Sequence, residues 1–205
     1  MTTAELAVRR ASPRGPGRPV SETIGPLVAA ARTGESGAVR ALLETLKPVV
    51  RRYCRARIGG RDLSYLSADD VAQEACLAVL KALPRYQDRG GSFLFLVRAI
   101  AANKVADAFR VIARERANPV PELPEFGPVE SQPETHVLNA DLGAQLGSLL
   151  ATLPADQQEI LVLRIVVGLS AAETGAALGI TAGNVRVRQH RALEKLRRLA
   201  ADRDF

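Results

Sequence analysis

A proline-rich strip, residues 117–137, divides this sequence into two parts. The strip holds four glutamates, no basic residue, and the prolines Pro119, Pro121, Pro124, Pro128 and Pro133. Proline lacks an amide hydrogen and clashes with the preceding helical turn, so no regular helix can cross the strip. An extended proline-rich chain reaches about 3 Å per residue, and this flexible linker can therefore hold its two flanking parts several tens of Å apart.

Both flanking parts repeat apolar residues at helical spacing, and no stretch alternates with period two for long enough to predict a strand. Before the strip we expect helices over residues 36–46, 48–58 and 67–83 and from residue 92 onward, with Ser36 capping the first and Pro48 opening the second. After the strip we expect helices over residues 138–153, 154–168, 170–178 and 181–199. The predicted fold class is all-α, with two small helical domains, residues 21–116 and 138–201, after a disordered basic tail, residues 1–20.

The composition limits the classes of function that fit. The chain of 205 residues carries 28 basic and 22 acidic residues, a net charge of +6, which favours a polyanionic partner. No stretch approaches the roughly 18 apolar residues of a membrane span, and no apolar segment follows the basic N-terminus as it would in a secretory signal. Cys54 and Cys76 lie in helical patterns without metal-ligand spacing, which indicates a reducing compartment and a cytoplasmic protein. With two histidines and no phosphate-binding loop, we expect no catalytic site, no cofactor and no bound metal.

The last two predicted helices have the signals of a helix-turn-helix. Ser170 and Glu173 have the spacing of a capping box, in which each side chain bonds to the backbone amide of the other residue. Gly179 supplies the left-handed residue of the turn, Ile180 can fill the core, and Thr181 can cap the second helix. The segment therefore predicts two short helices held at a fixed angle.

The second of these helices is strongly basic, because residues 182–199 hold six basic residues and one acidic residue. In a helix-turn-helix the second helix lies in the major groove and presents its N-terminal part to the bases. Helical spacing turns Val185, Leu193 and Leu196 toward the core and leaves a basic outer face, namely Arg186, Arg188, His190 and Arg191. An arginine there can bond to guanine or neutralise a phosphate. A solvated basic helix in an ordinary bundle is the alternative interpretation.

The helix over residues 67–83 has two faces. One is an apolar stripe of Val71, Ala75, Val79 and Leu83. The other combines acid, amide and apolar groups, Asp70, Gln73, Glu74 and Leu77, which suits a partner-binding face. The alternative is a purely structural role, because the helix dipole alone favours acidic residues in the first turn of a helix.

The segment over residues 86–95 joins a glycine-containing loop to the long helix that follows. Its aromatic residues near Arg89 can stack on unpaired bases, although Phe93 and Phe95 also suit a hydrophobic core. The following helix carries polar residues on one side, namely Asn103, Lys104, Asp107, Arg110 and Arg114. The segment is thus a candidate for binding single-stranded nucleic acid.

Together these motifs resemble a known family. The run from Ser67 to Glu74, Ser-Ala-Asp-Asp-Val-Ala-Gln-Glu, with the aromatic loop and basic helix after it, resembles region 2 of bacterial sigma factors. The segments 153–160, 168–174 and 183–188 resemble region 4. Because no region 3 is recognisable between them, the chain is similar to the extracytoplasmic-function (ECF, group 4) sigma factors of the sigma-70 family. Within that family it looks nearest to the actinobacterial sigma-D-like branch.

The resemblance implies a set of site residues and partners. Core RNA polymerase would be bound by Asp69, Asp70, Gln73, Glu74 and Leu77. The promoter −10 element would be read as a single strand by Arg89, Ser92, Phe93, Phe95, Asn103, Lys104, Asp107 and Arg110. The −35 element would be read as duplex DNA by Thr181, Asn184, Arg186, Val187, Arg188, His190 and Arg191. An anti-sigma factor is a further expected partner, and no direct membrane insertion is expected.

Two residues depart from the pattern of the family. Gln189 stands where many relatives carry an apolar residue, and His190 often corresponds to a different side chain. The first bears on the packing of the last helix and the second on the promoter sequence that it reads. The main alternative function is an autonomous helix-turn-helix regulator, in which the N-terminal helical part senses a ligand or dimerises.

Overall fold

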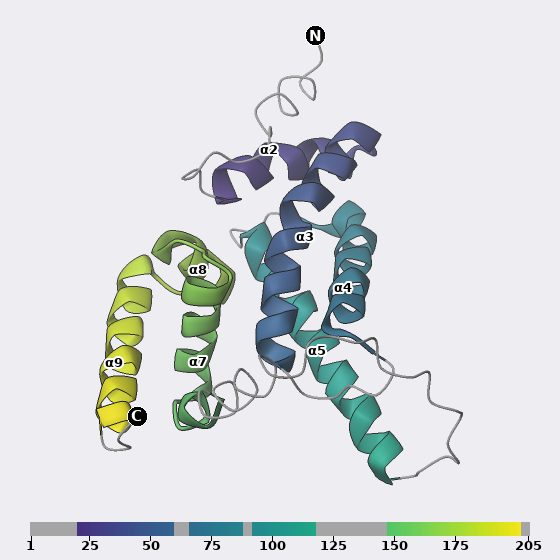
Figure 1. Ribbon diagram of the computed structural model, residues 1–205. Helices are drawn as coiled ribbons and strands as arrows, with labels where there is room; N and C mark the ends of the chain where they lie inside the picture. The colour runs from purple at the N-terminus through teal and green to yellow at the C-terminus, as the bar shows by residue number, and fades with distance from the viewer. Residues whose placement is uncertain (1–19, 60–65, 88–91, 118–146, 202–205) are drawn as a thin grey trace, which may run out of the picture.

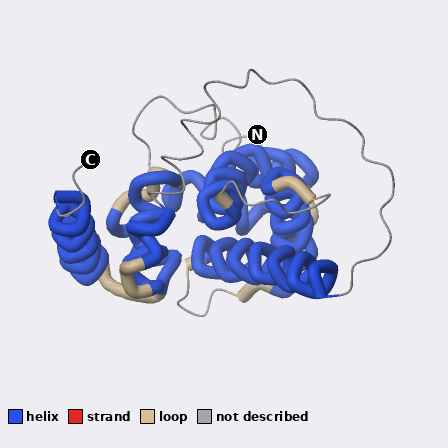
Figure 2. The backbone as a smooth tube through the Cα atoms, turned by 60° about the horizontal axis from the view of Figure 1, so that its bottom comes forward, coloured by secondary structure: helices blue, strands red, loops and turns tan. Residues whose placement is uncertain are grey.

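The computed structural model describes residues 20–59, 66–87, 92–117 and 147–201, and every regular element among them is a helix (Figures 1 and 2). The N-terminal body contains α2 (Val20–Arg32), α3 (Ser36–Ile58), α4 (Ala68–Ala82), a 3₁₀ turn η1 (Leu83–Arg85) and α5 (Phe93–Ala117). The C-terminal body contains a helical stretch over residues 147–151, α7 (Ala155–Leu161), a π-helical turn η2 (Val162–Val166), α8 (Ala171–Leu178) and α9 (Ala182–Ala201). The predicted all-α fold with two helical domains is confirmed. Residues 1–19, Arg89 and most of the predicted linker lie outside the described residues.

The N-terminal body is built around α3, against which α2, α4 and α5 pack (Figure 1). The predicted apolar stripes of α4 and α5 are buried in its core. They comprise Val71, Ala75, Val79 and Leu83 on α4–η1 and Val97, Ala101, Val105, Ala108 and Ile112 on α5. Helical spacing therefore identified the face that each helix turns inward.

Helix α3 differs from the prediction, because it runs without interruption through Pro48. The expected start of a second helix at Pro48 is wrong. Proline removes one backbone hydrogen bond, but Leu46 and Val50 on either side of it are almost fully buried, so packing stabilises the continuous helix. The expected cap is also displaced, since Glu35 is the N-cap and Ser36 is already helical. Helix α2 likewise begins at Val20, inside the predicted tail.

Most of the predicted helix-end signals are present. Around the start of α4, Ser67 Oγ accepts a hydrogen bond from the Asp70 amide at 3.1 Å, and Asp70 Oδ2 accepts from the Ser67 amide at 2.9 Å. Ser170 and Glu173 form the same reciprocal pair at α8, at 3.1 and 2.8 Å. Gly179 ends α8 with φ +70°. Local sequence therefore determines where these helices begin and end.

The two bodies pack against each other. In Figure 1, α7 and α8 lie between α9 and the helices of the N-terminal body, and contacts join α8 to α5 and η2 to α3. Side chains of η2, α8 and the segment before α8 enter the N-terminal core, namely Leu163, Val167, Leu169 and Ala177. The structure thus places the two domains side by side rather than apart. Within the described part of the chain, no helix combines the length and hydrophobicity needed to cross a membrane.

Candidate nucleic-acid and polymerase interfaces

The helix-turn-helix is formed by α8 and α9. Thr181 Oγ1 accepts from the Asn184 amide at 3.2 Å and caps α9, as the sequence predicted. Val185 is fully buried and packs with Ile160 of α7 and Ala171 of α8. This anchor fixes the rotation of α9 about its axis, so the face opposite Val185 is the one that solvent and DNA can reach.

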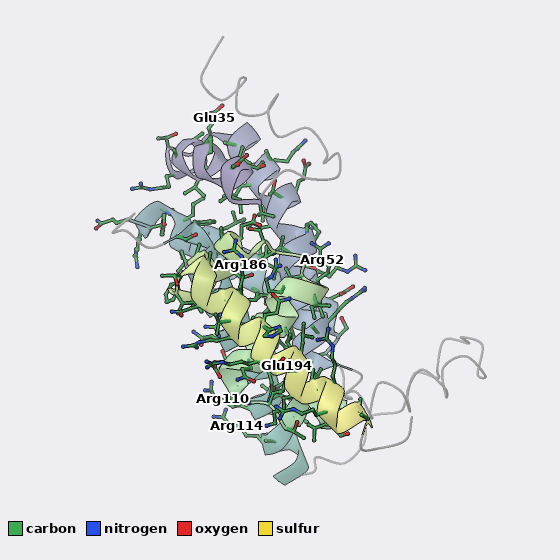
Figure 3. All side chains as sticks on the ribbon, turned by 90° about the vertical axis from the view of Figure 1, so that its left-hand side faces the viewer. Glu35, Arg52, Arg110, Arg114, Arg186 and Glu194 are labelled. Atoms are coloured by element: carbon green, nitrogen blue, oxygen red, sulfur yellow. The ribbon has the colours of Figure 1, made fainter. Side chains whose placement is uncertain are left out.

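The outer face of α9 carries the predicted DNA-contact residues. Arg186, Val187, His190 and Arg191 are exposed, and Figure 3, which looks onto α9, shows Arg186 toward its start. Two of the basic groups on this helix have acidic neighbours: Arg188 lies 2.7 Å from Asp156 of α7, and His190 lies 3.3 Å from Glu194. Arg186 and Arg191 have no ion-pair partner among the described residues, so their charges are fully available.

Gln189 has a clear packing role despite its departure from the family pattern. The side chain is half-buried, and its Oε1 accepts a hydrogen bond from Arg164 Nε at 2.9 Å. Arg164 also donates to the carbonyl of Leu169, so one guanidinium joins η2, the turn before α8 and the recognition helix. A polar residue at this position therefore packs by hydrogen bonding where an apolar one would pack by burial.

The first turn of α4 places the predicted polymerase-binding carboxylates in intramolecular contacts. Both oxygens of Asp69 accept from Arg55 at 2.8 Å, and Arg51 lies 3.3 Å away; these bonds hold the pKa of Asp69 below its usual range. Hydrogen bonds from Ser67 likewise lower the pKa of Asp70. Both carboxylates therefore stabilise the start of α4 as ionised groups.

The next turns of α4 present a more accessible face. Gln73 is exposed, and Leu77 is 51% exposed, a high value for a large apolar side chain. Glu74 Oε2 accepts from Lys104 Nζ of α5 at 3.0 Å, so it also helps to join the two helices. The accessible part of the predicted face thus lies around Gln73, Glu74 and Leu77.

The predicted −10 residues at the start of α5 divide into two groups. Phe93 is buried, with its ring edge-to-face against Tyr86 at a centroid distance of 5.1 Å, so it belongs to the core and cannot stack on a base in this arrangement. Phe95 is 46% exposed. Ser92 Oγ accepts from the Leu94 amide at 3.2 Å and helps to start α5.

The polar side of α5 follows the predicted spacing. Asn103 and Asp107 are exposed, and Arg110 pairs with Asp107 at 2.5 Å. Lys104 is held by Glu74. In Figure 3, Arg110 and Arg114 lie toward the end of α5, on the side of the molecule that also carries α9. The helix thus offers several cations on one side, some of them already paired.

Sequence reasoning missed one buried cluster, centred on Glu159 of α7. This carboxylate is 4% exposed and accepts hydrogen bonds from Tyr53 Oη at 2.9 Å and from Arg98 Nε at 2.7 Å. Burial and the neighbouring Glu159 raise the pKa of Tyr53 above its usual value. Burial lowers the pKa of Arg98, but its bond to Glu159 and their opposite charges raise that pKa overall. The sequence signal for this cluster was the position of Glu159 next to Ile160, on the side of the predicted helix 154–168 that carries its apolar residues.

Comparisons with known proteins agree with these features. The chain matches the family models "Sigma-70 region 2" over residues 42–115 and "Sigma-70, region 4" over residues 149–198. It is 54% identical over 176 residues to the ECF RNA polymerase sigma factor SigD of Mycobacterium tuberculosis, which covers 86% of this chain and 83% of that protein. It is 46% identical over 182 residues to the ECF RNA polymerase sigma factor ShbA of Streptomyces griseus, covering 86% and 95%.

The fold is also similar to a solved structure. A chain in the structure of CnrH in complex with the cytosolic domain of CnrY superposes with a TM-score of 0.58 at 25% identity, covering 87% of this chain and 97% of that one. The two family matches place regions 2 and 4 in a single chain, and the likeness of the fold extends over most of it. The protein belongs to the ECF RNA polymerase sigma factors of the sigma-70 family, in their sigma-D-like branch.

Proposed function

We propose that this protein is a promoter-specificity subunit of RNA polymerase, with α4 binding the core enzyme, the start of α5 reading the −10 element and α9 reading the −35 element. The observation that carries the proposal is that regions 2 and 4 match one chain in this order. The proposed domains, residues 21–116 and 138–201, enclose both matches. The polymerase performs the chemistry, so the protein needs no catalytic group of its own.

The geometry of α9 supports duplex recognition. Thr181 and Asn184 lie in its exposed first turn, followed by Arg186, Val187 and Arg191 on the outer face. An arginine can discriminate guanine by a bidentate bond, and an apolar side chain can contact a thymine methyl group. Arg188 and His190 would join them by exchanging Asp156 and Glu194 for phosphate or base oxygens.

The start of α5 suits an unpaired strand. Phe95 offers an exposed aromatic ring for stacking on a base. Asn103 and Arg110 follow on the exposed side of the same helix, where they can contact bases or phosphates. Reading one element as a single strand and the other as duplex requires two separate surfaces, which these helices supply.

The face of α4 around Gln73, Glu74 and Leu77 is the proposed core-polymerase surface. Leu77 supplies an exposed apolar side chain that a partner can remove from water. Glu74 supplies a negative charge. Asp69 and Asp70 contribute by fixing the start of the helix and by their negative charge. Since the polymerase is cytoplasmic, the protein acts in the cytoplasm.

The autonomous regulator is the less favoured function, because residues 42–115 match sigma region 2 where that hypothesis needs a ligand-sensing or dimerising body. A protein inhibitor remains part of the proposal. CnrH, whose structure is similar, was solved with the cytosolic domain of CnrY. This likeness supports an anti-sigma factor as a further partner of this chain.

The test is in vitro transcription on a genomic library, with core polymerase in the presence and absence of the full chain. The expected result is a set of start sites that depends on the chain. Footprinting of the same DNA with the chain alone provides the contrast, because a promoter-specificity subunit should protect little DNA without polymerase. Protection by the chain alone together with unchanged start sites would favour the autonomous regulator.

A further inference from the structure

The recognition helix α9 is anchored to the rest of the C-terminal body at two separate apolar points. Val185 provides the first anchor and Ala192 the second, and each packs into a different hydrophobic cluster. Both side chains are fully buried, and they lie about two helical turns apart. Between these anchors the inner side of α9 carries Gln189, which is half-buried. The packing of α9 therefore has a polar layer between two apolar ones.

Gln189 is held in place by Arg164. Its Oε1 accepts a hydrogen bond from Arg164 Nε at 2.9 Å, and the same guanidinium donates to the carbonyl of Leu169. Arg164 lies in the π-helical turn η2, in which the Val167 amide donates to the Val162 carbonyl at 2.9 Å. Such turns are rare and frequently occur at functional sites. The guanidinium is thus oriented from two directions before it reaches α9.

The other polar links between α9 and its surroundings are more exposed. Arg188 pairs with Asp156 at 2.7 Å, with both side chains about half exposed, and the proposed function requires Arg188 to exchange this partner for DNA. Lys195 Nζ donates to the carbonyl of Thr152 at 2.8 Å, also in an exposed position and in the second half of the helix. The bond to Gln189 is partly buried, lies in the first half of α9 and leaves the outer face free for DNA.

A hydrogen bond restricts the position of a helix in a way that apolar contacts do not. Burial of apolar surface is non-directional, so Val185 and Ala192 alone tolerate small rotations and slides of α9. A hydrogen bond weakens steeply when its angle departs from linearity. A polar group within an apolar helix contact is the best attested device for fixing the register of packed helices. Gln189 therefore defines both the rotation and the axial position of α9.

The two arginines without ion-pair partners on the outer face are close to this bond. Arg186 precedes Gln189 by three residues and Arg191 follows it by two, so both lie within about 5 Å of it along the helix axis. An arginine that discriminates guanine forms two parallel hydrogen bonds, and a binding geometry of this kind must be held within about 0.5 Å. Attraction to a phosphate varies only gradually with distance. A loosened α9 would thus keep its affinity for DNA and lose its preference between bases.

We infer that Gln189, held by Arg164, is a positioning residue that determines the base selectivity of α9 at the −35 element. The inference rests on the proposed function, because it requires α9 to read that element. Gln189 acts through the arginines around it and makes no contact with DNA itself. Loss of its bond leaves the body folded and the DNA bound, while the selectivity between base pairs falls.

The test uses core polymerase loaded with the full chain. The probe is the promoter of the strongest chain-dependent start site from the genomic library, with the base pairs of its −35 element randomised. Sequencing of the bound and the free DNA gives the preference at each position, as the ratio of the best to the worst base pair. The total fraction bound gives the overall affinity, and thermal melting of the free chain gives its stability.

Gln189→Met keeps nearly the same side-chain size but has no oxygen to accept from Arg164. The preference at the most selective position should fall about tenfold, the discrimination supplied by one well-aligned bidentate contact, with little change in total binding or melting temperature. Gln189→Glu retains an acceptor oxygen and should restore the preference, although its negative charge weakens binding to all sequences alike.

Gln158→Met on α7 is the matched control. It also removes a side-chain hydrogen bond, from Gln158 Nε2 to the carbonyl of Leu153 at 2.8 Å, but not one that reaches α9. Its preference should equal that of the wild type. A preference that falls equally in this control would show general loosening of the body and overturn the inference.

Arg164→Lys examines the pair from the other side, because lysine keeps the charge but lacks the planar fork that bonds to both acceptors. It should lower the preference as Gln189→Met does, and the double variant should be no less selective than either single variant, since the two residues act as a unit. Arg164→Lys decides the matter if Gln189→Met does not fold. Wild-type preference in the folded variants would overturn the inference. Failure of the proposed function is a different result, namely that the wild-type chain directs no start sites at all.

Discussion

The backbone carbonyl of Ile180 lies directly over Gly175: it would be 2.6 Å from a Cβ atom at that position, and the Ile180 amide donates to the Gly175 carbonyl at 3.0 Å. The turn of the helix-turn-helix thus folds back onto the middle of α8. Real Cβ atoms do not approach backbone oxygens this closely, so only glycine fits. This contact sets the angle at which α9 leaves α8.

Gly175→Ala should therefore destabilise the C-terminal body by about 1–3 kcal/mol, the usual cost of overpacking, because the added methyl group must displace backbone rather than a flexible side chain. Urea denaturation followed by circular dichroism measures the change. Gly183→Ala is the control, since a Cβ there meets only Thr181 Oγ1 at 3.8 Å. Equal stability of the two variants would contradict the close approach.

The sequence predicted the helix ends better than the relation between helices. Ser170 and Glu173 act within one turn, so their spacing alone predicts the cap. Ser67 and Asp70 form the same local pair at the start of α4. The continuity of α3 through Pro48 depends on partners distant in the sequence, which no local pattern contains. The burial of Glu159 was not predictable for the same reason, because its partner Tyr53 is 106 residues away in the sequence. Gln189 was recognised as unusual, but its partner Arg164 was not predictable.

Arg186→Ala and Arg191→Ala should each weaken promoter binding by the polymerase holoenzyme, by about 1–3 kcal/mol for a base contact. If the lost contact is to phosphate, the slope of log affinity against log salt should also fall by about one unit. Both charges lack an ion-pair partner among the described residues, so removing them disturbs no internal contact. Fluorescence anisotropy at several salt concentrations measures both quantities.

Arg40→Ala supplies the control for these variants, because Arg40 is an exposed arginine of α3 outside the proposed interfaces. It should leave promoter affinity unchanged, and all three variants should co-elute with core polymerase. Wild-type affinity and salt slope in both α9 variants would exclude the proposed orientation of the recognition helix.

Leu77→Ser should reduce capture of core polymerase while leaving the melting temperature of the free chain nearly unchanged, because this side chain is half exposed and contributes little to the core. Gel filtration with core polymerase, paired with thermal melting, separates the two effects. Undiminished co-elution would remove Leu77 from the polymerase surface.

Asp70→Ala, unlike Leu77→Ser, should lower the melting temperature of the free chain. The Asp70 carboxylate bonds to both the amide and the hydroxyl of Ser67, and the variant loses both bonds. The lowered pKa of Asp70 gives the pH dependence its sign. The stabilisation is complete above the usual carboxyl pKa and is lost as pH falls through the lowered value in the folded chain. Melting curves from pH 7 down to about pH 3 should therefore converge for wild type and variant. A constant difference over this range would argue against the ionised cap.

Cys54 and Cys76 should resist alkylation in the folded protein. Both thiols are buried, and burial raises the pKa of Cys54 to about 12 and that of Cys76 above its usual value. At pH 8 Cys54 therefore holds almost no thiolate in the folded chain, and Cys76 holds less than it would when unfolded, whereas unfolded cysteines, with a pKa of about 8.5, ionise in part and react. Mass spectrometry after brief exposure to iodoacetamide, with and without urea, measures the contrast. The exposed cysteine of the Arg40→Cys variant is the positive control, and equally fast labelling of Cys54 in the folded chain would show that α3 and α4 separate readily.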